Sequence, residues 1–192
     1  MNVAPVTLEG ERVSLIPLEA CHAEALFEAV STDVWTFLPS RMDKPEDMMN
    51  HVLEALQDKE QGTELPFVVL DKETGRIVGM TRLLNLSAEN RSLEIGWTWY
   101  STKVWRTRVN TECKFLLLSY CFEILHTIRV QFRVDSRNIR SNQAVQRIGA
   151  TKEGVLRKDR ILYDGYIRDT VTYSIVDDEW PGVKSRMNGF MR

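Results

Sequence analysis

Alternation of apolar and polar positions predicts several strands in the first half of the chain. Residues 66–70 and 77–84 are apolar runs separated by the turn sequence Asp-Lys-Glu-Thr-Gly-Arg, which predicts an antiparallel hairpin. A second turn at residues 87–90 leads into residues 92–100, so we expect a third antiparallel strand. Residues 12–17 predict one further short strand, which ends at a proline.

Three segments repeat their apolar positions at helical spacing instead. Residues 22–31 form a short amphipathic segment, and a longer one follows Pro45, a residue type favoured at the first position of a helix. The apolar stripe of that second segment indicates core, or the wall of a cleft. A third segment begins at Asn110 or Thr111, either of which can cap a helix that continues to about Leu125.

The last third of the chain returns to strand-like alternation around one short helix. Residues 129–134 alternate, Gly149 is the expected stop of a short helix, and residues 151–176 are interpreted as two strands. The order is thus strand, two helices, three strands, helix, strand, helix, two strands. This order predicts an α+β fold with a single mixed, mostly antiparallel central sheet flanked by helices.

Length and composition limit the classes of protein that remain. The 192 residues predict one domain over 1–192, with its core at about 8–180. The 43% hydrophobic and 27% charged residues are typical of a globular protein. The 25 basic and 27 acidic residues give a net charge of -2, so no bulk positive field favours nucleic acid as a partner.

Cysteine and histidine usage argues against a disulfide scaffold and a metal site. The three cysteines are odd in number and form no Cys-x-x-Cys pair, which fits a reducing cytoplasmic environment. The three histidines have no second ligand at metal spacing, so we expect no metal. No apolar run approaches the ~20 residues that span a bilayer, and the N-terminus lacks a secretory pattern. We therefore expect a cytoplasmic protein without a membrane partner.

The connection between the strand at 92–100 and the following helix is a candidate phosphate site. A tight loop entering a helix leaves backbone N–H groups unpaired, and the helix dipole makes them attractive to anions. Two arginines add positive charge. The candidate phosphate-binding residues are those of the loop and first helical turn: Arg106, Thr107, Arg108, Val109, Asn110 and Thr111. An ordinary strand-to-helix connection with solvated arginines is the alternative.

A second candidate lies at the start of the short helix. Asn138 and Ser141 are three residues apart, which by itself indicates an N-cap. The segments that follow carry a wider pattern: Asn-x-x-Ser-x-x-Ala-x-x-x-x-Gly-Ala at 138–150, Glu-Gly-Val-Leu-Arg at 153–157, Arg-Asp-Thr at 168–170, Tyr-Ser at 173–174 and Glu-Trp at 179–180. Taken together, they resemble the GCN5-related N-acetyltransferase (GNAT) superfamily. The chain is similar to the branch of ribosomal-protein N-terminal serine and alanine acetyltransferases (RimJ/RimL type).

This resemblance covers nearly the whole chain and implies a binding mode for acetyl-coenzyme A (acetyl-CoA). The cofactor would lie in a V-shaped opening between the strands at 94–100 and 129–134. Backbone groups near Thr98 and Tyr100 would pair with the pantetheine arm, and the loop before the helix would hold the pyrophosphate. Asn138 and Ser141 would lie near the cofactor sulfur.

The loop departs from the family pattern Gln/Arg-x-x-Gly-x-Gly/Ala. Arg108 stands at the first glycine position and Asn110 at the second. Glycine allows close approach to a phosphate and unusual dihedral angles, which an arginine adopts poorly. Either Arg108 turns its guanidinium aside and adds charge-assisted bonds, or it blocks the loop and weakens cofactor binding.

The implied reaction is attack of a neutral amine on the thioester carbonyl. At pH 7 an α-amine of pKa about 8 loses its proton at a cost of about 1.4 kcal/mol, whereas a lysine amine costs about 4.6 kcal/mol. Glu94 is the candidate general base, since Gly96 indicates a bulge or a close approach just beyond it. An ordinary strand carboxylate is the alternative. Ser141 is the candidate group that protonates or stabilises the leaving thiolate.

The acceptor is therefore expected to be an amine, either a protein N-terminus or a small amino metabolite. A catalytically degenerate acyl-CoA-binding or interaction module with the same fold is the alternative, because of the arginine-bearing loop. A homodimer is compatible with the sequence, since the tail at Trp180 can pack on a neighbour or on its own sheet.

Overall fold

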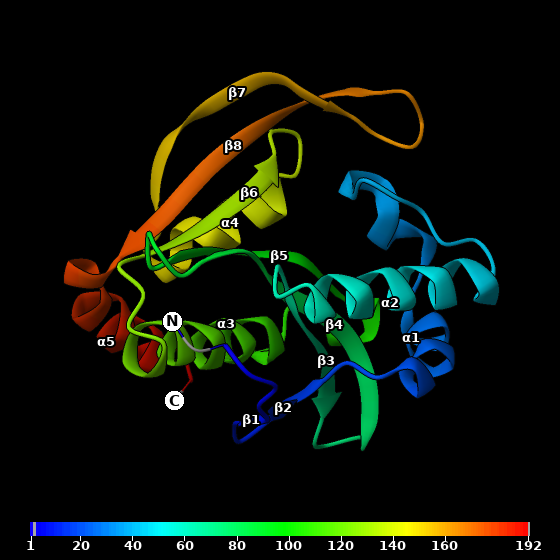
Figure 1. Ribbon diagram of the computed structural model, residues 1–192, viewed down its shortest axis with the longest axis horizontal. Coiled ribbons are helices and arrows are strands. Elements are labelled where there is room, and N and C mark those ends of the chain that lie inside the picture. The colour runs from blue at the N-terminus through cyan, green and yellow to red at the C-terminus, as the bar shows by residue number, and fades with distance from the viewer. Residues whose placement is uncertain (2, 192) are drawn as a thin grey trace.

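Every strand belongs to one eight-stranded sheet in the order β1-β2-β3-β4-β5-β6-β8-β7. The computed structural model describes residues 1 and 3–191. Figure 1 shows the arrangement. The strands are β1 (Leu8–Glu9), β2 (Val13–Pro17), β3 (Leu65–Asp71), β4 (Arg76–Ser87), β5 (Ser92–Tyr100), β6 (Arg129–Asp135), β7 (Thr151–Ile161) and β8 (Ile167–Val176). The helices are α1 (Ala23–Ala29), α2 (Pro45–Glu60), α3 (Val109–Ser119), α4 (Ile139–Ile148) and α5 (Trp180–Met191).

The pairing is antiparallel except between β5 and β6, the one parallel pair in the part of the chain that is described. That pair is short. Only Ser92 to Glu94 are in register with Arg129 to Gln131, and beyond this point the two strands separate. The separation produces the V-shaped opening, and the predicted mixed, mostly antiparallel sheet is confirmed.

A bulge in β5 lies just beyond the last residue of this strand that pairs with β6. The register between β4 and β5 shifts there, and Trp97 has a positive φ of 47°. A Cβ atom at Gly96 would lie 2.5 Å from Leu84 Cδ1 and 3.2 Å from Glu94 Oε1, so a side chain at this position would displace its neighbours. The prediction that Gly96 marks a bulge or a close approach is therefore confirmed.

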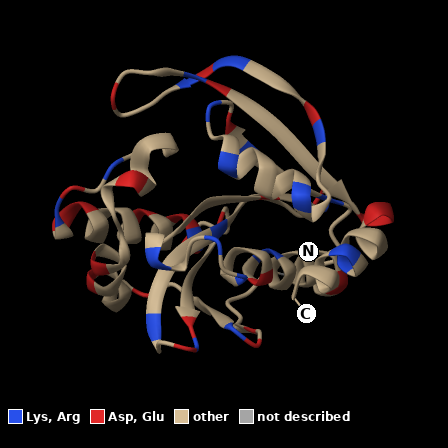
Figure 2. Cartoon of the chain, turned by 180° about the vertical axis from the view of Figure 1, so that it is seen from behind, with Lys and Arg blue, Asp and Glu red and all other residues tan. Residues whose placement is uncertain are grey.

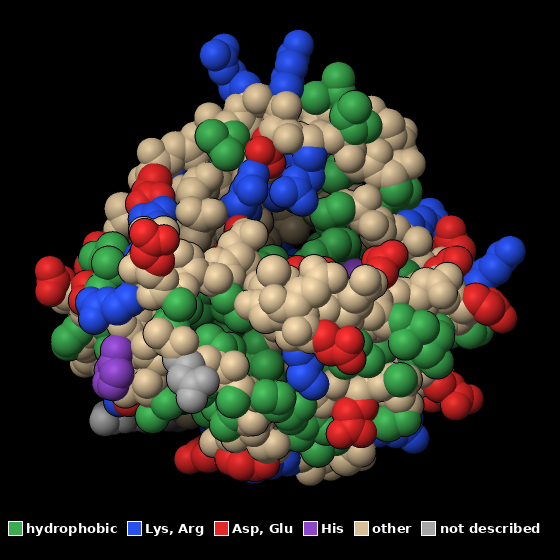
Figure 3. Space-filling view, viewed as in Figure 1, with side chains coloured by type: hydrophobic (Ala, Val, Ile, Leu, Met, Phe, Trp, Pro, Cys, Tyr) green, Lys and Arg blue, Asp and Glu red, His purple; other side chains and the backbone are tan. Residues whose placement is uncertain are grey.

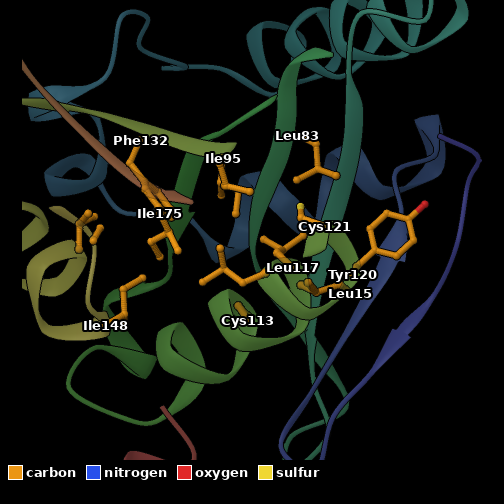
Figure 4. Close-up of a cluster of buried hydrophobic side chains, with 14 of the residues drawn as sticks. Leu15, Leu83, Ile95, Cys113, Leu117, Tyr120, Cys121, Phe132, Ile148 and Ile175 are labelled. Atoms are coloured by element: carbon orange, nitrogen blue, oxygen red, sulfur yellow. The ribbon is translucent and has the colours of Figure 1, made fainter. Parts of the chain in front are cut away.

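Strand alternation divides the core into two clusters, one on each face of the sheet. On β3, Val68 packs with α1 and α2, whereas Phe67 and Val69 belong to the cluster that contains α3 and α5. In Figure 1, α3 and α5 lie to the left of β3 and β4, and α1 and α2 to the right. Figure 4 shows the larger cluster, in which Leu117 and Cys113 of α3 point toward the strands.

The start of α3 differs from the prediction. Arg108 is the N-cap residue, and no side chain caps the helix, so the expectation that Asn110 or Thr111 caps it is wrong. Both residues lie within the first helical turn. The regular helix ends at Ser119, and a π-helical turn, η4 (Tyr120–Ile124), follows. The short two-residue strand β1 was not predicted.

The C-terminal helix α5 was not predicted either, although its buried residues Trp180, Val183 and Met187 recur at helical spacing. Two glycines in this segment weaken the helical signal. Trp180 is stacked on Phe122, and its indole N–H donates to Glu123 Oε1 at 2.8 Å. Trp180 is thus buried within its own chain. Among the described residues, none of the helices is long and apolar enough to cross a membrane.

Candidate active site

A cavity of about 550 Å³ occupies the opening between β5 and β6. Its walls come from both separating strands, from the loop before α3 and from α4 along its length. Figure 3 shows its mouth as a hollow beneath β7 and β8, with Lys and Arg side chains gathered along the upper rim. The cavity therefore joins the two faces of the sheet through the gap between the strands.

The cavity brings together most of the residues that the sequence predicted. Those that line it are Thr98, Tyr100, Arg106, Thr107, Asn110, Asn138 and Ser141. Four others do not line it: Glu94, Arg108, Val109 and Thr111. Val109 and Thr111 are buried in the first turn of α3, so only their main-chain groups are available to a ligand at the helix start.

The loop before α3 adopts its unusual geometry at a different residue from the one expected. Arg106 has a positive φ of 63°, whereas Arg108 is in the ordinary right-handed helical region. The Arg108 side chain turns away from the cavity, where it pairs with Glu11 at 3.3 Å and donates to the Met191 carbonyl at 3.1 Å. The Arg108 guanidinium is thus turned aside, as in the first of the two alternatives, and its polar contacts are with Glu11 and the Met191 carbonyl.

Main-chain donors at the start of α3 remain available. Within the described residues, the N–H groups of Asn110 and Thr111 have no main-chain partner, because the first bond of the helix runs from Glu112 N to Arg108 O at 2.9 Å. The side chain of Thr107 accepts from Val109 N at 3.3 Å and fixes the turn. The positive end of the helix dipole therefore faces the cavity with unpaired donors.

The start of α4 combines an N-cap with a free hydroxyl. Asn138 Oδ1 accepts from Ser141 N at 3.0 Å, so Asn138 caps the helix through the main chain of Ser141. The Ser141 hydroxyl forms no hydrogen bond among the described residues and faces the cavity. The helix ends at Gly149, whose φ of 111° is the expected left-handed stop.

Glu94 is buried where β5 and β6 part. Leu93 and Ile95 face the α3 side of the sheet, so Glu94 points to the opposite face. Its side chain is 7% exposed and accepts from Asn85 Nδ2 at 3.2 Å. Burial raises the pKa of Glu94, and the nearby charge of Arg133 offsets only part of that effect. A carboxylate with a raised pKa is a better proton acceptor than an ordinary one.

Two arginines of α4 that the sequence reasoning missed also line the cavity. The guanidinium of Arg140 lies 3.5 Å from the ring centre of Trp105, and Arg147 donates to Thr111 Oγ1 at 2.7 Å. They are seven residues apart and share one helical face with Ala144. That spacing was the sequence signal from which the two arginines could have been predicted to lie on one face of α4. Together with Arg106 they give the cavity a basic end beside the start of α3.

Lys114 is another lining residue that the sequence reasoning missed. It is 6% exposed, its ammonium donates to Thr98 Oγ1 at 2.7 Å, and it forms no ion pair with a described carboxylate. Burial lowers the pKa of Lys114 to about 8. No motif identifies Lys114, because a single lysine in a helical sequence is ordinarily interpreted as a solvent-exposed residue.

The burial of Lys114 predicts a stability effect that depends on pH. A shift of the Lys114 pKa from 10.5 to about 8 corresponds to a cost on the order of 3 kcal/mol while the amine is protonated. Lys114→Met is therefore expected to raise the free energy of unfolding at pH 7 by about 2 kcal/mol. Between pH 8 and 10.5 the unfolded wild type binds more protons than the folded form, so wild-type stability rises and the difference shrinks.

Urea unfolding of both proteins at pH 7 and pH 10 measures this effect. The exposed Lys103→Met is the matched control and should leave the stability unchanged at both values of pH. If Lys114→Met is no more stable than wild type at pH 7, the cost of burying the Lys114 ammonium is already offset by other interactions in the folded protein.

The fold and the opening define a class of protein. A family model described as the acetyltransferase (GNAT) domain matches residues 12–151. The chain therefore belongs to the GNAT acetyltransferase family and is an N-acetyltransferase, as the resemblance of the C-terminal motifs implied.

Individual relatives agree with this class. "Putative ribosomal N-acetyltransferase YdaF" of Bacillus subtilis is 34% identical over 110 residues, an alignment that spans 57% of this chain and 59% of that protein. A GCN5-related N-acetyltransferase from Brucella melitensis is 28% identical with a TM-score of 0.91, covering 99% of this chain and 87% of its own. RimJ of Mycobacterium smegmatis, solved with CoA-disulfide, shares the fold at 23% identity and a TM-score of 0.85, with 98% and 96% covered.

Proposed function

We propose that this protein transfers the acetyl group of acetyl-CoA to a primary amine by direct attack. The observation that carries the proposal is the continuous cavity between β5 and β6, which has unpaired helix N–H groups and arginines at one end. Glu94 is buried beside the parting of the same strands. Such an opening suits a long ligand with an anionic end and a reactive end.

Acetyl-CoA binding is assigned to the lining residues. The main chain of β5 at Thr98 and Tyr100 would pair with the pantetheine amides where β6 no longer pairs. The unpaired N–H groups at the start of α3, those of Asn110 and Thr111, would receive the pyrophosphate, helped by the guanidinium groups of Arg140 and Arg147. In this assignment Arg108 contributes its main chain only. Among the described residues no group of three or more His, Cys, Asp or Glu is placed to hold a metal ion.

The chemistry follows from the same geometry. Glu94 accepts the proton of the attacking amine, directly or through one water, and its raised pKa suits that role. The amine nitrogen forms a bond to the thioester carbonyl carbon, the C–S bond breaks and the CoA thiolate leaves. The Ser141 hydroxyl stabilises that thiolate by hydrogen bonding. An α-amine needs about 3 kcal/mol less help to lose its proton than a lysine amine does.

Ser141 provides a clean test because its hydroxyl has no structural partner. Ser141→Ala keeps the main-chain N–H that Asn138 caps, so helix α4 should be unaffected. We expect kcat to fall about tenfold, with the acetyl-CoA dissociation constant within about threefold of wild type. Steady-state kinetics with a fluorescence titration of CoA measures both. Turnover equal to wild type would leave Ser141 with a capping role alone.

The acceptor is proposed to be a protein N-terminus or a small amine. The name of the B. subtilis relative favours a ribosomal protein, and the lower cost of deprotonation favours an α-amine. A radiolabelled acetyl transfer assay across N-terminal peptides and small amines, run beside a CoA titration, tests the function. Transfer to at least one α-amine is expected. Tight CoA binding with no acceptor acetylated would indicate instead a module that binds acyl-CoA without turnover.

A further inference from the structure

A second buried cation in the cavity, besides Lys114, has no counter-ion among the described residues. Arg168 of β8 is 5% exposed and lines the cavity, and its Nε atom has no hydrogen-bond partner. Within the described residues its guanidinium forms neither a hydrogen bond nor an ion pair. A buried charge in this state is costly unless a ligand pairs with it.

The neighbouring carboxylates are already engaged elsewhere. Asp135 accepts three bonds from Arg137, at 2.8, 2.9 and 3.1 Å. Asp159 accepts from Arg133 at 2.6 Å and from Thr170 at 2.8 Å. Since both partners are occupied, the region around Arg168 carries uncompensated positive charge. Figure 2 shows Lys and Arg positions along the β7–β8 hairpin, with Asp and Glu positions between them.

Arg168 lies on the same face of the sheet as Glu94. The apolar residues of β6 and β8 face α3 and α5, so the alternate positions, including Arg133 and Arg168, face the other way. Glu94 is in register with Gln131, two residues before Arg133. Along this face Arg133 lies between Gln131 and Asp135, and Asp135 pairs with Thr170, two residues from Arg168. The charge of Arg133 acts on both Glu94 and Arg168.

The proposed pyrophosphate site is on the opposite side. The start of α3 and the arginines of α4 belong to the helices that pack against the apolar residues of β6 and β8. Arg168 therefore lines the part of the cavity that lies on the other face of the sheet. An anion that pairs with Arg168 enters from the side of Glu94, which is the side from which an acceptor amine would reach the base.

We propose that Arg168 binds a carboxylate of the acceptor and so orients the acceptor in the cavity, on the face of the sheet to which Glu94 points. This assignment rests on the proposed acetyl transfer and narrows its acceptor to amines that carry a carboxylate nearby. Two sources offer that chemistry: an acidic side chain next to a peptide N-terminus, and the carboxylate of a free amino acid. Arginine suits the role because its planar fork pairs with both carboxylate oxygens.

Matched acceptors test the assignment on the unaltered protein. The first arm compares peptides that begin Ser-Glu with peptides that begin Ser-Gln, and the second compares free amino acids with their amides. In at least one arm, wild-type kcat/KM should be about tenfold or more higher for the acceptor with the carboxylate than for its amide counterpart. The arm that shows this preference identifies the source of the carboxylate. Equal rates for both members in both arms would overturn the assignment.

Variants then connect the preference to the residue. Arg168→Gln should reduce the preference to about twofold or less, with an unchanged acetyl-CoA dissociation constant, and Arg168→Lys should retain part of it. The exposed Arg157→Gln on β7 is the matched control and should behave as wild type. Weakened acetyl-CoA binding with the preference intact would assign Arg168 to the cofactor and contradict the proposal.

The wild-type comparison keeps the test valid even if Arg168→Gln fails to fold. Transfer without a carboxylate preference contradicts the role of Arg168 only. A complete lack of transfer to every amine contradicts the proposed function as well.

Discussion

Replacing Glu94 with glutamine is expected to lower kcat by about 100-fold or more, while the acetyl-CoA dissociation constant changes by less than about threefold. Glutamine keeps the size of the side chain and an oxygen that can accept from Asn85, which lies 3.2 Å away. It cannot accept the amine proton. Glu94 also does not line the cavity, so cofactor contacts should persist.

The pH dependence gives a second test of the same residue. Burial raises the pKa of Glu94, and the base works only when it is deprotonated. Wild-type kcat/KM should therefore fall as pH decreases through this raised pKa, in addition to the fall caused by protonation of the acceptor amine. In Glu94→Gln only the contribution of the amine should remain. An acidic limb that is identical in both proteins would remove Glu94 from the mechanism.

Introducing glutamate at Ala144 is expected to weaken acetyl-CoA binding by about 100-fold or more. Ala144 is a small residue on the cavity-lining face of α4, between Arg140 and Arg147. A longer acidic side chain there fills part of the opening and places negative charge beside the proposed pyrophosphate position. Like charges in such a setting cost several kcal/mol, and 1.4 kcal/mol corresponds to a factor of ten in affinity.

Ile139→Glu is the matched control for this variant. Ile139 is on the same helix, is 67% exposed and does not line the cavity, so the same charge should leave binding within about twofold of wild type. Isothermal titration with acetyl-CoA measures both. Equal weakening by the two variants would point to a general electrostatic effect and away from this site.

The fold could be predicted because its elements have strong local signals. The Asp-Lys-Glu-Thr-Gly-Arg turn between β3 and β4 and the Gly149 stop were both read from short sequence patterns, and both are present. The start of α3 was misassigned because Asn110 is a good cap by residue type, whereas the structure makes Arg108 the N-cap with no capping side chain. Helix α5 was missed because its glycines obscure a stripe that tertiary packing stabilises.

The candidate site was predictable only where a residue contributes through its main chain or a motif. Asn138, Ser141 and the loop before α3 came from such patterns and line the cavity. Lys114 and Arg168 could not be predicted in this way. They stand out because they are buried without a carboxylate partner, and their burial depends on neighbours that are distant in sequence. The direction of the Arg108 side chain was likewise undetermined, because it depends on Glu11 and the C-terminal helix.

The central claim is that the loop before α3 holds a pyrophosphate even though arginine and asparagine occupy the positions where the family pattern has glycine or alanine. Thermal unfolding with increasing acetyl-CoA tests it most directly. At 100 times the dissociation constant the ligand should stabilise the protein by about 2.7 kcal/mol, and Ala144→Glu should lose that stabilisation at the same concentration. A wild-type protein whose unfolding temperature does not respond to millimolar acetyl-CoA would contradict the account.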